Sequence, residues 1–202
     1  MFRKFQAVCS IIRICNIFIA CFASIVAFIL LGATHYTQLF YCILLISSLI
    51  AFGNTLNDIV DLKTDIISHP NRPLPSKRLT HTEAKYILFV SILIAIIVTC
   101  FINRMALVCT YFFIIPLLIL YSITLKNIPL IGNIVIAFLL SMVFIYTEIL
   151  LYQTWIALLI PAGLAFGLSL IREIVKDISD YKGDKSAGIM TMPVYCGINF
   201  SI

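Results

Sequence analysis

Charged residues are scarce in this chain of 202 residues, since Asp, Glu, Lys and Arg make up 11% of it and apolar residues 62%. Soluble domains carry about 25% charged and about 45 to 50% apolar residues, so this composition excludes a water-soluble globular fold. Acidic residues are the scarcest charged class, with nine against fourteen Lys and Arg. Together with a mean hydropathy of +1.10, these proportions indicate an integral membrane protein.

The chain also lacks paired cysteines of the metal-binding or redox type. Its seven cysteines form no C-x-x-C pair and lie mostly inside apolar runs, so we interpret them as small packing residues. Zinc sites and disulfide frameworks are therefore disfavoured. The net charge of +5 does not call for a nucleic-acid partner, because membrane orientation and the binding of anionic headgroups or phosphates account for it.

Long apolar runs predict an all-α fold, a polytopic transmembrane helical bundle. About 20 residues of helix cross a hydrocarbon core of about 30 Å, and about six runs approach that length. The predicted spans are residues 14–31, 39–52, 86–101, 106–125, 130–151 and 155–171. The second run is short, and we expect its helix to continue into the acidic residues that follow. We treat residues 1–202 as one domain.

The basic residues predict an orientation. Lys and Arg gather in cytoplasmic loops, and thirteen of the fourteen fall on one side of the predicted spans, with Arg104 alone on the other. We therefore expect the N-terminus on the cytoplasmic side. The loops that carry most of the acidic residues share that face.

Six of the nine acidic residues form two clusters, which are the most informative feature of the sequence. The first holds Asp58, Asp61 and Asp65 after Asn57, and the second holds Asp177, Asp180 and Asp184. Burying each charge in hydrocarbon costs roughly 2.5 to 3.5 kcal/mol, so both clusters must line a polar cavity or the interface. A single acidic cluster would most simply be interpreted as solvated loop charges, but two acidic clusters on the same face favour a binding site.

The spacing of the clusters predicts a cation site. If both segments are helical, intervals of three and four residues place the side chains of each cluster on one face, where like charges repel unless a cation lies among them. Gly183 weakens the helical pattern of the second cluster. Oxygen-only ligands suit Mg²⁺, which proteins bind through one or two carboxylates, water and a substrate phosphate. Two such clusters facing each other predict a diphosphate held between metal ions.

Sequence motifs around both clusters resemble those of the UbiA-type intramembrane prenyltransferases. The first motif is Asn57-Asp58-x-x-Asp61-x-x-x-Asp65 with Asn71-Arg72-Pro73, and the second is Arg172-Glu173-Ile174-Val175-Lys176-Asp177-x-x-Asp180-x-x-Gly183-Asp184. Weaker matches are Arg13 with Asn16, Tyr121 with Lys126, and Gly132-Asn133. Among family members, the second motif is most similar to that of the digeranylgeranylglyceryl phosphate synthases.

The resemblance implies an enzyme that transfers a polyprenyl group from an isoprenyl diphosphate to a lipophilic acceptor, with Mg²⁺ as cofactor. It implies Asp61, Asp65, Asp180 and Asp184 as the catalytic core, with Asn57 joining them as metal ligands. Asn57, Asp58, Arg72, Lys126, Tyr121, Asp177 and Asn16 are then the substrate-binding residues. Within that set, Arg72 and Lys126 would neutralise diphosphate oxygens, and the ring of Tyr121 could stabilise an allylic cation.

Several alternatives remain open at this point. The acceptor implied by the second motif is a prenylglyceryl phosphate, but a hydroxylated aromatic acceptor of quinone biosynthesis would use the same cation chemistry. The family typically has about nine spans, with the second motif after the sixth, so we expect this chain to lack the later helices. An inactive homologue or a partner subunit is therefore a second hypothesis. A cation channel is disfavoured, because its acidic residues would continue through the spans.

Overall fold

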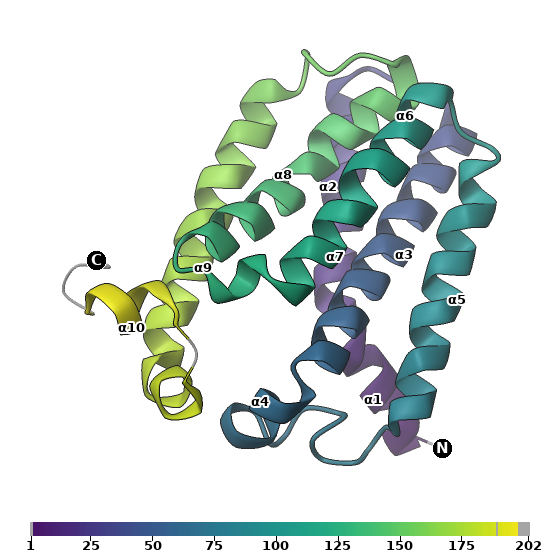
Figure 1. The fold of residues 1–202 in the computed structure, drawn as a ribbon. Coiled ribbons are helices and arrows are strands. Elements are labelled where there is room, and N and C mark those ends of the chain that lie inside the picture. Colours follow the sequence, from purple (N-terminus) through teal and green to yellow (C-terminus); the bar gives the residue numbers. More distant parts are fainter. Residues whose placement is uncertain (1, 189, 198–202) are drawn as a thin grey trace.

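The computed structural model describes residues 2–188 and 190–197, except for the side chains of Phe2, Lys182, Asp184, Ser186 and Ala187. Within the described ranges every regular element is a helix and there is no strand. The long helices lie side by side in one bundle (Figure 1). The prediction of an all-α bundle is confirmed.

Ten α-helices follow one another along the described chain. They are α1 (Phe2–Ile11), α2 (Ile14–Leu30), α3 (Tyr36–Val60), α4 (Leu62–Ser68), α5 (His81–Thr99), α6 (Arg104–Cys109), α7 (Ile115–Ile123), α8 (Ile131–Tyr152), α9 (Leu159–Ala187) and α10 (Met192–Cys196). A π-helical turn at Thr110–Ile114 joins α6 to α7. A 3-10 turn at Leu125–Asn127 precedes α8.

Membrane-spanning helices account for most of the bundle. By length and composition, four stretches of the described chain could cross a membrane: α3, α5, Arg104–Ile123 and α8. The pair α1 and α2, bent by 54°, makes a fifth when it is counted as one span. The sixth predicted span corresponds to the apolar first part of α9, a 29-residue helix whose charged residues begin at Arg172. The structure therefore gives four or five such spans where the sequence predicted about six.

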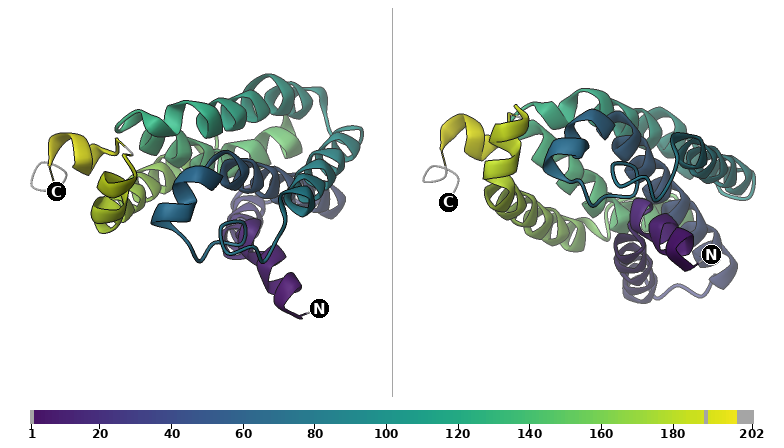
Figure 2. Two further views of the ribbon diagram at one scale, coloured as in Figure 1. Left: turned by 60° about the horizontal axis from the view of Figure 1, so that its bottom comes forward. Right: turned by 90° about the horizontal axis from the view of Figure 1, so that it is seen from below.

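Helix α3 is the central element of the bundle. It packs against α2, α5, α7 and α8. Both views in Figure 2 show α3 among these neighbours. Leu45 on α3 and Tyr146 on α8 are almost fully buried in the main core. Large apolar side chains such as Phe22 and Phe112 are instead exposed on the outside, as expected where the surrounding solvent is lipid.

One local expectation is confirmed at the end of a helix, and local sequence also explains where another helix begins. Helix α3 runs through the start of the first acidic cluster as far as Val60. Helix α5 begins with the capping box that Thr80 and Glu83 predict, in which each side chain accepts a hydrogen bond from the other's backbone N–H. Lys4 lies 2.5 Å from Glu83 and so ties the N-terminal helix to the same end of the bundle.

A buried glutamate organises the loop between α8 and α9 at the opposite end. Glu148 is 1% exposed. Its carboxylate accepts hydrogen bonds from the Thr154 hydroxyl and from the backbone N–H groups of Ile156, Ala157 and Leu158, at 2.8 to 3.0 Å. These donors satisfy the carboxylate and hold the chain that leads into α9. Glu148 therefore has a structural role and lies far along α8 from the acidic clusters.

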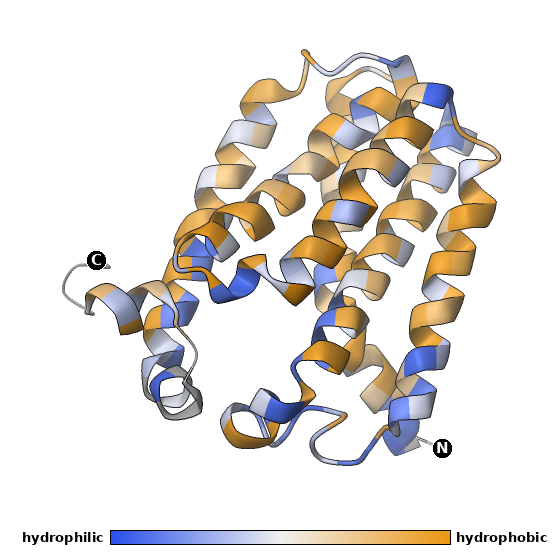
Figure 3. Cartoon of the chain, in the orientation of Figure 1, coloured by the Kyte–Doolittle hydropathy of each residue, from blue (hydrophilic) through white to orange (hydrophobic). Residues whose placement is uncertain are grey.

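Hydrophilic residues gather at one end of the bundle. Figure 3 shows them on α4, on the loop that follows it, at the start of α5 and on the second half of α9. Arg104 begins α6 at the other end. Both acidic clusters therefore lie at the same end of the helices, as the distribution of basic residues predicted.

Candidate functional site

The two acidic clusters line one cavity at the polar end of the bundle. This outer cavity has a volume of about 400 Å³ and is lined by Asp61 and Asp65 on one side and by Asp177 and Asp180 on the other. Helix α4 packs against α9, which brings the two clusters together. The prediction that they face a common space is confirmed for these four aspartates.

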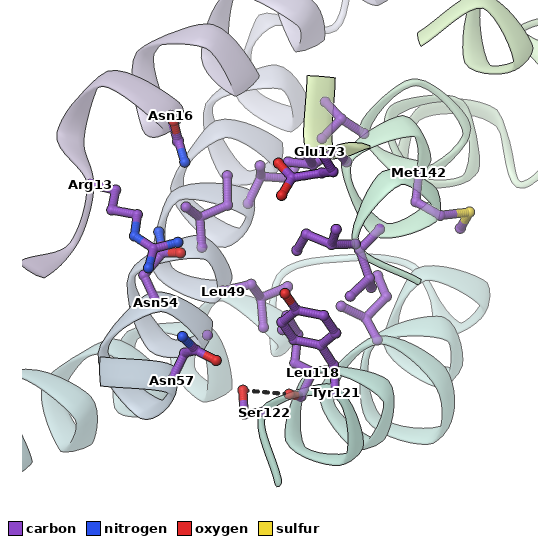
Figure 4. A pocket seen from close by; sticks show the side chains of 18 of the residues that line it. Arg13, Asn16, Leu49, Asn54, Asn57, Leu118, Tyr121, Ser122, Met142 and Glu173 are labelled. Atoms are coloured by element: carbon purple, nitrogen blue, oxygen red, sulfur yellow. Dashed lines mark hydrogen bonds between the residues drawn. The ribbon is translucent and has the colours of Figure 1, made fainter. Parts of the chain in front are cut away.

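A second, mostly apolar cavity adjoins the first and extends between the helices. It has a volume of about 350 Å³, and its walls come from α3, α7 and α8. Figure 4 shows Leu49, Leu118 and Met142 around it, with Asn16 and Tyr121 among the polar groups that also line it. Seven residues line both cavities: Arg13, Asn57, Arg72, Tyr121, Ile136, Glu173 and Lys176. The two spaces therefore form a polar mouth and an apolar interior.

Asp61 is held by a lysine from the α7–α8 connection. The Lys126 ammonium lies 2.5 Å from Asp61 Oδ1 and 3.1 Å from the side-chain oxygen of Asn57. Asn57 in turn donates to Asp61 Oδ2 at 2.9 Å. Asp61 is the residue between the end of α3 and the start of α4. Its backbone N–H still donates to the carbonyl oxygen of Asn57, four residues earlier, as in a helix.

Gly132 allows the turn that carries Lys126 to approach α8 closely. A Cβ at this position would lie 2.9 Å from Lys126 Cα and 3.1 Å from its carbonyl oxygen. Both are backbone atoms, which cannot rotate away. The sequence contains no signal for this contact beyond the glycine itself.

We expect Gly132→Ala to lower the free energy of unfolding by about 1 to 3 kcal/mol, the usual penalty of overpacking. Thermal unfolding in detergent measures the change. Gly163→Ala on α9 is the matched control, because nothing lies within 4 Å of a Cβ there. Alanine in that helix should leave stability unchanged or raise it by up to about 1 kcal/mol. Equal effects of the two substitutions would contradict the close approach.

Asp65 and Asp58 are both buried and bound by arginines. Arg72 Nη1 donates to the two carboxylate oxygens of Asp65 at 2.8 and 2.7 Å and lies 3.9 Å from Asp58. Arg13 Nη2 donates to Asp58 Oδ1 at 3.3 Å. Asp58 lines neither cavity. Asp58 therefore holds Arg13 and Arg72 in position from outside the cavities, whereas Asp65 lines the outer cavity.

Backbone geometry places both arginines. Arg13 has φ 54° and ψ 61°, a left-handed conformation that is uncommon outside glycine and occurs at the bend between α1 and α2. Arg72 lies in the loop after α4, where Leu74 and Leu79 are buried against Ala7 and Ile11 of α1. The loop therefore has its own small apolar core, and its conformation is not that of a free surface segment.

The second cluster is organised by residues from α8 and α9. Asn133 on α8 donates to Asp177 Oδ2 at 2.7 Å. Burial raises the pKa of Asp177 above its ordinary value, and the hydrogen bond from Asn133 partly offsets that rise. Glu173 lies one helical turn before Asp177, where it contacts Arg172 and has Lys176 at 3.6 Å. The acidic stripe therefore extends deeper into the bundle than the cluster defined by sequence.

His69 also lines the outer cavity, between the two clusters. Burial and the nearby Arg72 guanidinium lower the pKa of His69 below its ordinary value. A lowered pKa favours the neutral imidazole, which adds no charge to the cavity.

Most of the predicted site residues are brought together. Asn57, Asp61, Asp65, Arg72, Tyr121, Lys126, Asp177 and Asp180 line the outer cavity, and Asn16 lines the inner one. The side chain of Asp184 lies outside the described residues. Sequence reasoning left out Glu173, Lys176 and Asn133 as site residues. Helical periodicity counted back from Asp177 would have indicated Glu173, whereas nothing local indicates the contact of Asn133 with α9.

The donor set fits a hard cation bound together with an anionic ligand. Among the described side chains, no group of three His, Cys, Asp or Glu residues is close enough to hold a metal by itself. Mg²⁺ needs only one or two carboxylates when water and phosphate complete its shell, and the cavity offers five. The buried hydroxyl of Thr191 lines this cavity and has no partner among the described residues, which leaves a polar group for a ligand.

Fold and site together define an integral membrane protein whose helices enclose an apolar cavity with an acidic mouth. Residues 17–202 match the UbiA prenyltransferase family, and the chain belongs to it. The digeranylgeranylglyceryl phosphate synthase of Methanococcus maripaludis strain C7 is 34% identical over 72% of this chain and 51% of its own length. That of Methanobrevibacter smithii is 30% identical over 95% of this chain and 69% of its own length. The chain thus spans about half to two thirds of these relatives.

Solved structures share the fold. A structure of digeranylgeranylglyceryl phosphate synthase is 28% identical, with a TM-score of 0.74 over 98% of this chain and 72% of that protein. A UbiA homologue from Archaeoglobus fulgidus, solved with DMAPP and Mg²⁺ bound, is 20% identical, with a TM-score of 0.77 over 96% of this chain and 70% of that one. The helical arrangement is therefore that of the family.

Proposed function

We propose that this protein transfers a polyprenyl group from an isoprenyl diphosphate to a lipophilic acceptor inside the membrane. The observation that carries the proposal is the polar mouth, lined by two acidic stripes and by Arg72 and Lys126, that opens into an apolar cavity. An isoprenyl diphosphate has the matching division into a highly charged head and an apolar tail. Membership of the UbiA prenyltransferase family supports the same reaction.

The acidic stripes are proposed to bind Mg²⁺ and, through it, the diphosphate. Asn57, Asp61 and Asp65 would hold one edge of the head, and Asp180 with Asp184 the other. When bound, Mg²⁺ supplies the positive charge that makes diphosphate an acceptable leaving group. Asp58 and Asp177 would support these ligands, since one binds Arg13 and the other accepts from Asn133.

Arg72 and Lys126 are proposed to bind the diphosphate oxygens directly. Both line the outer cavity, and both now contact carboxylates of the first cluster. A bound anionic head would compete with the carboxylates for Arg72 and Lys126, and the carboxylates would then be available to hold Mg²⁺. The negative charge that develops on the departing diphosphate would then be stabilised by positive groups that are already in position. Such preorganised electrostatic stabilisation of the transition state is usually the largest single contribution to catalysis.

The inner cavity is proposed to hold the prenyl tail and protect the allylic cation from water. Its walls are mostly aliphatic, and the Tyr121 ring stands where the two cavities meet. An aromatic face attracts a cation by about 0.5 to 2 kcal/mol, more when water is excluded. Asn16 lies deeper along the same wall, where it is proposed to contact the substrates.

The acceptor that we propose is a prenylglyceryl phosphate, and the donor geranylgeranyl diphosphate. Relatives at 30 to 34% identity are digeranylgeranylglyceryl phosphate synthases, which supports this choice over an aromatic acceptor. We further propose that the single domain of residues 1–202 lies with its N-terminus and both acidic clusters on the cytoplasmic side. The proposed partners are thus the donor, the acceptor and the surrounding lipid.

Product formation in membranes tests this function. Membranes containing the chain, labelled geranylgeranyl diphosphate and Mg²⁺ are expected to give a prenylated product with geranylgeranylglyceryl phosphate, and to give none after EDTA treatment. A homogentisate or 4-hydroxybenzoate arm tests the aromatic alternative. A full-length active relative serves as the positive control. Absence of product with every acceptor, while the control is active, would refute the proposal and favour an inactive homologue.

A further inference from the structure

Glu173 lies at the junction of the two cavities. It is 7% exposed, and among the described residues it is the one carboxylate that lines both spaces. Asp61, Asp65, Asp177 and Asp180 line the outer cavity alone. Figure 4 shows the Glu173 carboxylate and the Tyr121 hydroxyl pointing into the pocket from different helices.

The two carboxylate oxygens of Glu173 have different contacts. Arg172 donates to Oε1. Oε2 makes no hydrogen bond among the described residues, and the Lys176 ammonium lies 3.6 Å from it. The two cations are largely exposed, whereas the carboxylate is not. Glu173 therefore has one oxygen, Oε2, that is ion-paired but not hydrogen-bonded, and its side chain lines the junction where the head and the tail of a prenyl diphosphate would meet.

The proposed transfer needs a group that accepts a proton at this position. If the acceptor attacks through a hydroxyl, its oxygen becomes positively charged as it bonds to the allylic carbon, and it must lose its proton. The other described carboxylates are less suited to this role. Asp58 lines neither cavity, and Asp177 accepts from Asn133 and lines only the outer one. Asp61, Asp65 and Asp180 are proposed metal ligands and also line only the outer cavity. General bases must lie within hydrogen-bond reach of the proton that they take.

Resting on the proposed prenyl transfer, we propose that Glu173 is the catalytic base for an alcohol acceptor. The bond between C1 of the prenyl group and the diphosphate oxygen breaks, and its electron pair leaves with diphosphate. A lone pair of the acceptor oxygen forms the new bond to C1, and the hydroxyl proton passes to Glu173 Oε2. The products are an ether, diphosphate and a protonated carboxyl group, so charge and atoms balance without any further reactant.

The Glu173→Gln variant tests this role, because it keeps the shape of the side chain and removes the base. With geranylgeranyl diphosphate, Mg²⁺ and geranylgeranylglyceryl phosphate, we expect ether formation to fall by about 10²- to 10³-fold. Binding of geranylgeranyl diphosphate with Mg²⁺, measured by calorimetry in detergent, should change less than about twofold, because the head is held by other residues. Glu173→Asp should recover part of the rate.

Separate measurement of diphosphate release distinguishes a base from a packing residue. In the glutamine variant, diphosphate release should exceed ether formation, with prenyl alcohol from capture by water as the second product. Unchanged ether formation would overturn the assignment, and so would a loss of donor binding equal to the loss of rate. If the wild-type protein forms no ether although the active relative does, it is the proposed function that fails, so the two failures are distinguishable.

Discussion

Asp61→Ala is expected to lower the rate of prenyl transfer by on the order of 10⁴-fold or more. A bound metal ion stabilises the transition state by several kcal/mol, and each tenfold in rate corresponds to about 1.4 kcal/mol. Asp61 is the centre of the first cluster, with Asn57 donating to one oxygen and Lys126 to the other. The substitution removes a proposed metal ligand and also releases Lys126 from its position. Product formation from labelled geranylgeranyl diphosphate at saturating Mg²⁺ measures the loss.

The matched control for Asp61→Ala is Glu83→Gln. Glu83 is an acidic residue at the same end of the bundle but outside both cavities, and glutamine also supports a capping box. This variant should keep activity within about twofold of wild type, because surface changes of this kind alter stability by only about 0.5 kcal/mol. Activity of Asp61→Ala within tenfold of wild type would show that the first cluster does not hold the donor.

Arg72→Met is expected to lower the free energy of unfolding by about 3 to 5 kcal/mol, the usual result of removing one partner of a buried ion pair. Arg72 is the cation nearest to Asp65 and the second cation near Asp58, and both carboxylates have side chains only 5% exposed. Methionine fills similar space but leaves Asp65 charged and without its donors. Thermal unfolding in detergent measures the loss.

A second substitution separates the ion pair from simple packing. Combining Arg72→Met with Asp65→Asn should recover a large part of the lost stability, because the unpaired buried charge is then absent. Residues in direct contact show non-additive effects of about 0.5 to 3 kcal/mol in such cycles. Strictly additive losses would mean that Arg72 stabilises the protein by packing alone. Activity should stay low in both variants, since the proposed diphosphate contact is lost.

The helices could be predicted well from the sequence, because apolar length and capping residues act locally. Five of the six predicted spans appear in four membrane-length stretches and one bent pair. The bend itself was not predicted, because it depends on the left-handed backbone of Arg13, a residue that sequence rules place in an ordinary helix. The position of α9 was predicted, but not its continuous course through the second cluster, since Gly183 weakens the helical pattern there.

The part of the site that depends on local sequence patterns could also be predicted. Periodicity alone placed the aspartates of each cluster on one face, and the basic residues placed both clusters at one end. Glu173 was left out because the second acidic cluster was counted from Asp177 onward, although its interval of four residues to Asp177 carries the same signal. Asn133 gave no such signal, because its partner Asp177 is 44 residues away and on another helix.

The sequence by itself determined the class of protein, the helical bundle and the presence of two acidic stripes, because hydropathy, charge and helical period are properties of short segments. Only the tertiary structure decided which cation meets which carboxylate: Lys126 reaches Asp61 across 65 residues, and Arg13 reaches Asp58 across 45. These pairings depend on how whole helices pack. Packing also decided that the acidic mouth opens into an apolar cavity, with Glu173 where the two spaces meet.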